Sequence, residues 1–457
     1  MVDPSPSRLG HASRRLLQDS LQLNHGQNLL IFADPAAQAV VELVTAEAQK
    51  LGVSVTTLYI PRTIQSNFPA HASLPLPVEA AIREANAVLS CLSPQAEHMA
   101  YRARVLRDSW RRRVRVAHAP GMDLEVLRML DTDFDLVRER CRDLALALIM
   151  GKELCLHTRD SRGEAYTLWV ELQGWDLPPG ISDGRIPDGS WANLPPGETF
   201  IVPYEAEGAV AINGSVPGRV IRPGQEIVLH FQEGRLKYVQ PEDSPTARYL
   251  HATQFAYAEQ ANDPNWRNLA EVGFGVNPAI HHLTGVELVD EKRLGTVHVA
   301  LGASNFLGGS VESTIHCDLV IEEPTVTIDR KPILEEGRWL LRREDWLPDH
   351  LTISVPAGWW ASVRTLRRTS SRSHREHGLL YRGWGSRSGG RLHIPVGVER
   401  TSLLAARLMD ILHERGVEMP KAAFIAQARQ AGLLEKELPA LVWILDRYDL
   451  VRVQKGP

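Results

Sequence analysis

Apolar and polar positions follow two alternating rhythms over the first 150 residues. Short apolar runs predict β-strands at 28–32, 53–59, 87–91 and 114–118. Longer segments, with apolar residues three or four positions apart, predict helices at 8–21, 36–51, 78–85, 96–110, 124–130 and 135–150. Strands that alternate with helices need crossover connections, so this part is expected to be an α/β domain with a doubly wound, mainly parallel sheet.

From residue 151 the pattern changes to short apolar runs between turn residues. Strands are predicted at 153–158, 165–172, 198–203, 218–221, 226–231 and 236–238, and one helix at 254–263. We therefore expect a β-rich second domain over 151–336. Beyond it, helical stretches at 402–414, 421–431 and 437–448 and a strand at 450–453 resemble a small α+β winged-helix module, which would be the third domain, 337–457.

Histidines and carboxylates are set into the apolar runs of the second domain. His316 and Asp318 are two positions apart in the predicted strand 315–321, so both side chains project from one face. His298 lies in another apolar run, 296–301, Glu271 lies upstream, and Glu198 follows a Pro-Pro-Gly turn. Imidazole nitrogens with carboxylate oxygens suit zinc, manganese, cobalt or iron, whereas a closed structural zinc site usually contains thiolates.

Composition narrows the class of protein. The 457 residues carry a net charge of −4, which does not favour bulk attraction to nucleic acid or to a membrane surface. The four cysteines are widely spaced and form no C-x-x-C pair, which indicates a reducing compartment. The sequence has no long apolar run and no apolar leader, so a cytoplasmic location without a membrane segment is expected.

Four sequence motifs occur in a fixed order: NLPPGETFIVP, NLAEVGFGVNP, GTVHVALG and STIHCDLVI. Together they resemble the aminopeptidase T / aminopeptidase S family of dinuclear metallopeptidases, over about residues 30–334. The resemblance implies a homodimer that removes N-terminal residues from peptides with a free amine. It also implies two divalent metal ions (zinc, cobalt or manganese) bound by Glu198, Glu271, His298, His316 and Asp318, with Glu198 and Glu271 assigned as catalytic as well.

The sequence departs from the family pattern in two places. Family members often have a tyrosine seven residues after the histidine of the ALG motif, and this chain has Asn305 there. A proton-transfer role then falls to another group, for which Glu312 and Glu205 are candidates, although both also fit a surface position. The chain also continues well past residue 334, where the family pattern ends.

Two other functions remain open. The chain is also similar to distant relatives of this family, iron(II) ring-cleaving dioxygenases of dihydroxypyridine type, in which His298, His316 and Asp318 would form a two-histidine, one-carboxylate triad. The presence of both Glu198 and Glu271 favours the peptidase. The remaining alternative is a non-catalytic protein that binds a peptide or protein partner through the C-terminal domain. The apolar helix 437–448 is poor in base-reading groups, so nucleic acid is not expected there.

Overall fold

The structure is a computed structural model of the chain. It describes residues 6–69, 72–95, 98–112, 114–173, 177, 179–186 and 189–346, and the backbone of short strands at 351–356, 419–420 and 451–456. The chain divides into two compact units. The first comprises Met1–Glu139, Ser182–Glu198 and Gly275–Leu294, and the second comprises Arg140–Ile181, Thr199–Phe274 and Gly295–Pro457.

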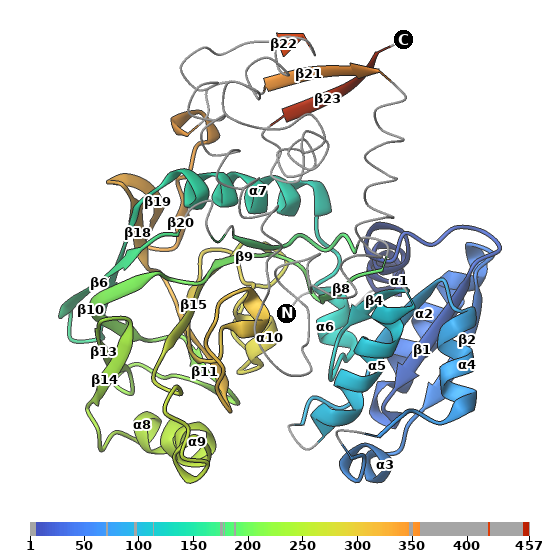
Figure 1. The fold of residues 1–457 in the computed structure, drawn as a ribbon, viewed down its shortest axis with the longest axis horizontal. Helices are drawn as coiled ribbons and strands as arrows, with labels where there is room; N and C mark the ends of the chain where they lie inside the picture. The colour runs from blue at the N-terminus through green and yellow to red at the C-terminus, as the bar shows by residue number, and fades with distance from the viewer. Residues whose placement is uncertain are drawn as a thin grey trace. The chain divides into compact units, whose positions relative to one another are not determined.

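The first unit is built on a parallel sheet (Figure 1). Its strands are β1 (Asn28–Ala33), β2 (Ser54–Tyr59), β3 (Ala87–Cys91), β4 (Arg115–His118) and β8 (Trp191–Asn193). They lie in the order β2-β1-β3-β4-β8, and every neighbouring pair is parallel. The four strands predicted in the first 150 residues are confirmed, and β8 joins them from a segment that the sequence assigns to the second domain.

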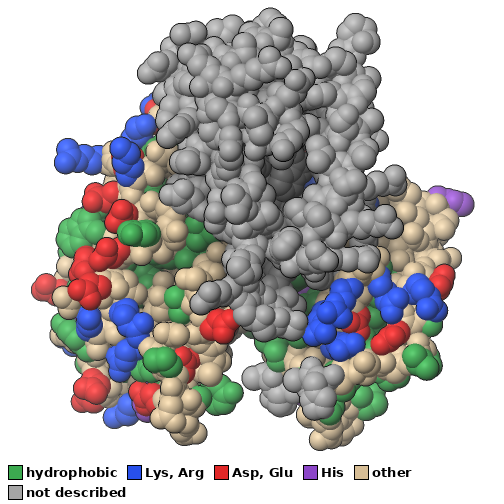
Figure 2. All heavy atoms as spheres, viewed as in Figure 1, with side chains coloured by type: hydrophobic (Ala, Val, Ile, Leu, Met, Phe, Trp, Pro, Cys, Tyr) green, Lys and Arg blue, Asp and Glu red, His purple; other side chains and the backbone are tan. Residues whose placement is uncertain are grey.

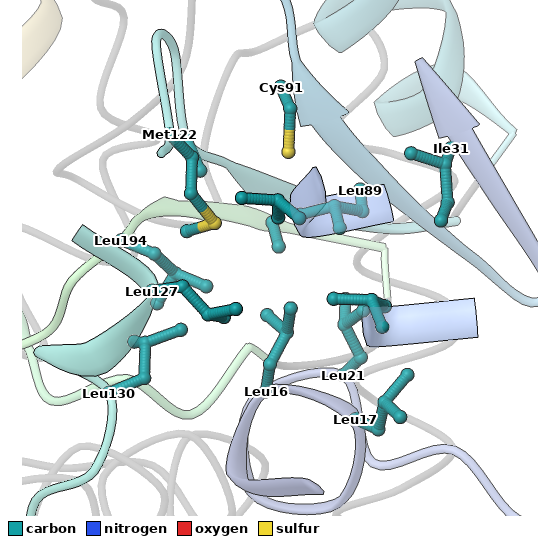
Figure 3. Close-up of a cluster of buried hydrophobic side chains, with 14 of the residues drawn as sticks. Leu16, Leu17, Leu21, Ile31, Leu89, Cys91, Met122, Leu127, Leu130 and Leu194 are labelled. Carbon is teal, nitrogen blue, oxygen red and sulfur yellow. The ribbon is translucent and has the colours of Figure 1, made fainter. Parts of the chain in front are cut away.

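Both faces of the parallel sheet are covered by helices, which confirms the doubly wound class. Alternate residues of β1 separate two apolar cores: Leu29 and Ile31 pack with one cluster, and Leu30 and Phe32 with the other. The first cluster, shown in Figure 3, is closed by α1 (Pro6–Arg15), α2 (Gln38–Lys50), α6 (Leu124–Arg128) and the turn Leu16–Ser20. The second is closed by α4 (Leu76–Glu84) and α5 (Met99–Arg111).

Short helices complete the first unit. They are α3 (Arg62–Ser66) and α10 (Glu287–Asp290). A 3-10 turn, Pro35–Ala37, follows β1 and begins at Asp34, whose side chain accepts a hydrogen bond from the Ala36 amide at 2.9 Å. Asp34 therefore acts as a helix cap.

Two antiparallel sheets are built mainly from residues of the second unit. The strands of one are β5 (Glu153–Arg159), β6 (Ala165–Glu171), β10 (Glu205–Ile212), β13 (Ile227–Gln232), β14 (Arg235–Gln240), β18 (Thr325–Ile328), β19 (Lys331–Glu335) and β20 (Arg338–Trp339). They lie in the order β14-β13-β10-β6-β5-β18-β19-β20. The sequence pattern does not predict β10, because Gly208 interrupts its apolar run. In the structure Gly208 has a φ of +109°, which glycine adopts readily.

The other antiparallel sheet carries most of the candidate site. Its strands are β7 (Gly180–Ser182), β9 (Glu198–Ile201), β11 (Ser215–Val216), β12 (Arg219–Val220), β15 (Leu269–Gly275), β16 (Val297–Gly302) and β17 (His316–Ile321), in the order β12-β11-β17-β16-β15-β9-β7. The helices of this part of the chain are α7 (Phe134–Met150), α8 (Pro245–Leu250) and α9 (Ala256–Gln260). The helix predicted at 254–263 corresponds to α9 and the π-helical turn His251–Phe255 before it.

The C-terminal region is described only as strands. They are β21 (Leu351–Pro356), β22 (Met419–Pro420) and β23 (Val451–Gly456), which pair in parallel in the order β22-β21-β23. The winged-helix prediction depends on helices at 402–448, which lie outside the described residues apart from β22. It stays a prediction, and so do the domain limits 1–150, 151–336 and 337–457.

The described surface carries charges of both signs. Figure 2 shows Lys and Arg side chains interspersed with Asp and Glu side chains on the visible face, in keeping with the small net charge of −4. Among the described residues, none of the helices has both the length and the apolar character needed to cross a bilayer. All four cysteines are free thiols.

The first apolar core is expected to stabilise its unit strongly. Leu16 is fully buried, whereas Leu76 is 80% exposed on α4. Leu16→Ala should lower the free energy of unfolding by about 3 kcal/mol, because it removes packed methyl groups and leaves a cavity. The matched change Leu76→Ala should lower it by less than about 0.5 kcal/mol. Urea unfolding followed by fluorescence measures both values, and equal effects would contradict the packing described for Leu16.

His118 at the end of β4 makes the stability of the first unit depend on pH. Burial lowers the pKa of His118 to about 4, helped by the nearby Arg102 guanidinium, although a hydrogen bond to Asn193 opposes the shift. An unfolded histidine has a pKa of about 6.5, so the unfolded chain takes up the proton first as the pH falls. The resulting stability is complete above pH 6.5 and is lost towards pH 4, by at most about 3 kcal/mol.

Urea unfolding at several pH values tests this dependence. The variant His118→Gln should show a smaller loss of stability between pH 6.5 and 4 than the wild type. An unchanged slope would show that other groups carry the dependence.

Candidate metal centre

Three neighbouring strands of the second unit present four of the five predicted ligands on one face. In the antiparallel register, Glu271 of β15 lies opposite Ala300 of β16, which lies opposite Asp318 of β17. His298 is two residues from Ala300, and His316 is two residues from Asp318. Because side chains alternate along a strand, the four residues share one face of the sheet.

Small residues occupy several other positions of this face. Gly273 pairs with His298, and Gly302 pairs with His316, while Ala300 lies between Glu271 and Asp318. A Cβ atom at residue 273 would lie only 2.2 Å from Cε1 and Nε2 of His298, so the imidazole lies over the glycine backbone. The face therefore has room for polar side chains to converge. The opposite face is apolar and buried, and Cys317 lies there with no exposed area.

A main-chain hydrogen bond orients His316. Its Nδ1 donates to the carbonyl oxygen of Ala303 at 2.8 Å, which turns Nε2 towards the carboxylates. Nε2 lies 3.2 Å from Glu271 Oε2 and 3.4 Å from Asp318 Oδ1. The edge of Phe306 packs on the ring, with centroids 4.7 Å apart. In its neutral form the imidazole therefore directs a lone pair at the point where both carboxylates meet.

His298 approaches the same carboxylates from β16. Its Nε2 lies 3.4 Å from Glu271 Oε1 and 4.0 Å from Asp318 Oδ1. The two oxygens of Glu271 therefore face different histidines. Glu271, His316 and Asp318 alone already bring ligand atoms within 4.8 Å of one another.

The cluster places negative charge away from water. Glu271 is 4% exposed, Asp318 is 7% exposed and His298 is fully buried. Burial disfavours a charged imidazole, but Asp318 and Glu271 outweigh it and raise the pKa of His316 well above its usual value. Buried charges of this kind are paired or bind metals, and a divalent cation would neutralise both carboxylates and replace the proton.

The distances fit the coordination of one ion. Zinc binds nitrogen and oxygen ligands at about 2.0–2.2 Å, so neighbouring ligands of a tetrahedral site are about 3.3–3.6 Å apart. The contacts of Glu271 and His316 in the cluster span 3.2–3.4 Å. The residues of the second unit therefore supply a set that fits one divalent ion without large movement.

Glu198, the remaining predicted ligand, belongs to the first unit and has a partner there that the sequence analysis missed. Glu198 Oε2 accepts a hydrogen bond from Lys292 Nζ at 2.8 Å, and the same ammonium contacts Glu291 Oε1. Lys292 is fully buried, with Glu198 at 2% exposure and Glu291 at 6%. Burial opposes the charge of Lys292, but the two carboxylates prevail and raise its pKa.

Asn277 holds the segments of this ion pair together. Its amide donates to the carbonyl of Lys292 at 2.9 Å, and its side chain donates to the carbonyl of Pro196 at 2.8 Å. In sequence, Glu291-Lys292-Arg293 has the polarity of an exposed turn, so no local signal indicates that Lys292 is buried. Asn277, near the end of the second motif, is the residue that could have indicated a structural junction.

Four other polar residues are exposed, namely Glu205, His281, His282 and Glu312, and Asn305 is partly buried. Glu205 and Glu312 are both exposed, which agrees with the surface alternative and leaves their catalytic role a prediction. His281 and His282 are exposed, and His282 pairs with Glu125 at 3.1 Å. Asn305 is partly buried, and its backbone amide donates to the carbonyl of Val311 at 3.0 Å.

Two solved structures resemble this fold. The structure of 2,5-dihydroxypyridine dioxygenase from Pseudomonas putida KT2440 aligns with a TM-score of 0.56 and 17% identity, over 75% of this chain and 99% of that one. Wild-type AmpT from Thermus thermophilus aligns with a TM-score of 0.48 and 19% identity, over 73% of this chain and 99% of that one. No protein-family model and no curated protein sequence matches the chain. The first likeness shows a shared fold, and the second is too low to add to it.

Gly273→Ala tests whether the small residues of this face permit the cluster. The new methyl group would overlap the His298 ring, so the ring must move away from Glu271. We expect the affinity for a divalent ion to fall at least about tenfold, as when a supporting contact of a metal ligand is lost. Isothermal titration with zinc measures the affinity. Cys317→Ala, on the opposite face, serves as the control and should keep the wild-type affinity.

Proposed function

We propose that the chain is a metal-dependent hydrolase of the aminopeptidase type, which removes N-terminal residues from peptides with a free amine. The observation that supports this most is the position of Glu271 between both histidines, with Asp318 beside them. Two carboxylates with two imidazoles form a hard, anionic ligand set for a divalent ion. The match of four ordered motifs to the aminopeptidase T / aminopeptidase S family supports the substrate class.

A divalent ion held by these residues supplies a Lewis acid for the scissile carbonyl and lowers the pKa of a water molecule. Asp318 and the two imidazoles would hold the ion, and the carbonyl of Ala303 keeps His316 in the orientation that binding requires. Glu271 has two oxygens in the cluster, so one would hold the ion while the other would accept a proton from the attacking water. Residue 305 is an asparagine, so no tyrosine at that position shares this task.

Zinc, cobalt and manganese all suit these ligands. The family resemblance implies two such ions, whereas Glu271, His316 and Asp318 of the second unit already bring together the ligand atoms for one. A homodimer and a cytoplasmic location are further proposals that follow from the resemblance and from the sequence.

An iron(II) ring-cleaving dioxygenase is the second candidate. His298, His316 and Asp318 share one face and would form a two-histidine, one-carboxylate triad, and the fold is shared with a dioxygenase. Such a triad needs open positions for oxygen and substrate. Glu271 contacts both histidines and would fill one of these positions, which is why the hydrolase is preferred.

Peptide hydrolysis after removal and return of metal tests the proposal. The purified protein should release the first residue of a peptide with a free amine, and not of the same peptide with an acetylated amine. Exhaustive chelation should abolish the release, and zinc, cobalt or manganese should restore it. His316→Ala should lower kcat/KM by at least about a thousandfold, because it removes a ligand.

The exposed His282 provides a matched histidine control. His282→Ala should leave kcat/KM unchanged. Full activity after chelation would overturn the proposal. Oxygen uptake with 2,5-dihydroxypyridine and iron(II), without peptide hydrolysis, would favour the dioxygenase, and metal-independent peptide binding without turnover would favour a binding protein.

A further inference from the structure

We infer that the Lys292 ammonium occupies the role of a second metal ion at Glu198, so that the chain binds one divalent ion rather than two. The inference rests on the proposed function in one respect, namely that the cluster of Glu271, His298, His316 and Asp318 binds a metal. It concerns the number of ions and the part that Glu198 plays.

The ammonium group already neutralises the carboxylate that a second ion would need. Lys292 Nζ lies 2.8 Å from Glu198 Oε2, at the distance of a charge-assisted hydrogen bond, and also contacts Glu291. The three side chains are buried, so water does not screen the attraction. A divalent ion bound to Glu198 at this position would lie close to the positively charged ammonium group of Lys292 and would be repelled by it.

Lys292 is also fixed by its own backbone and cannot readily withdraw. Its amide donates to the carbonyl of Val289 at 3.1 Å, and its carbonyl accepts from the Asn277 amide at 2.9 Å. Asn277 is itself fully buried and bonded to Pro196, two residues before Glu198. Displacing the ammonium would leave it buried without its carboxylates, which is a costly arrangement for any charged group.

The ligands that the second unit provides also indicate one bound ion. Two-metal hydrolytic sites hold their ions about 3.5–4 Å apart and share carboxylates between them. Glu271, His316 and Asp318 have contact distances that fit the coordination shell of a single ion. The family resemblance adds Glu198 to the set, and that residue is the one engaged by Lys292.

Counting bound ions in the purified full chain tests the inference without measuring activity. The protein is loaded with excess zinc, desalted and measured by native mass spectrometry and by elemental analysis. The wild type should contain one zinc ion per chain. Lys292→Gln and Lys292→Met, which remove the charge beside Glu198 and Glu291, should each contain two.

Lys50→Met is the matched control, because Lys50 pairs with Glu47 at 2.5 Å but is exposed to solvent. This variant should contain one ion, like the wild type. Two ions in the wild type, or one ion in a folded Lys292 variant, would overturn the inference while leaving the proposed function intact. No bound ion in the wild type would overturn the proposed function and the inference with it. If one Lys292 variant fails to fold, the other decides the comparison.

The double variant Lys292→Met with Glu291→Gln covers the case in which neither single variant folds. It lowers the negative charge that the lost ammonium leaves behind. Glu198 remains available, so a second ion is again expected, and a count of one in the folded double variant would overturn the inference.

Discussion

A carboxylate that is shielded from water needs a positive charge next to it, and this requirement governs the polar interior of the protein. Glu271 and Asp318 meet it with the imidazoles of His298 and His316, and Glu198 and Glu291 meet it with Lys292. The two clusters differ in the group that provides the positive charge. The first brings imidazole and carboxylate groups together as possible ligands of a divalent ion, whereas the second contains its own fixed cation.

The sheets provide the rigid positions that such charges require. In the second unit, three adjacent strands fix Glu271, His298 and Asp318 through main-chain pairing rather than through loop conformation. Apolar residues on the reverse face, such as Val299 and Leu319, are fully buried. The packing that stabilises the sheet therefore also sets the spacing of the ligands.

The alternation of apolar and polar residues makes many of these strands predictable from the sequence. The strands of the parallel sheet up to β4 and the shared face of His316 and Asp318 follow from local alternation, which a single sequence displays directly. The pairing of β8 with β4 does not, because Trp191–Asn193 is three residues long and its neighbours come from distant parts of the chain. Lys292 was missed for a related reason: its burial depends on Asn277 and Pro196, and its neighbours in sequence are charged.

One contact of the cluster has a consequence for how mutations report on it. The acceptor that aligns His316 is the carbonyl of Ala303, a group that every amino acid possesses. Replacing residue 303 by another amino acid leaves that acceptor chemically present, so a scan of side chains would pass over it. A change in the length of the loop between β16 and β17 would move this carbonyl and remove the alignment. Deletions there would therefore misorient the His316 ring, even where the deleted residue has no essential side chain.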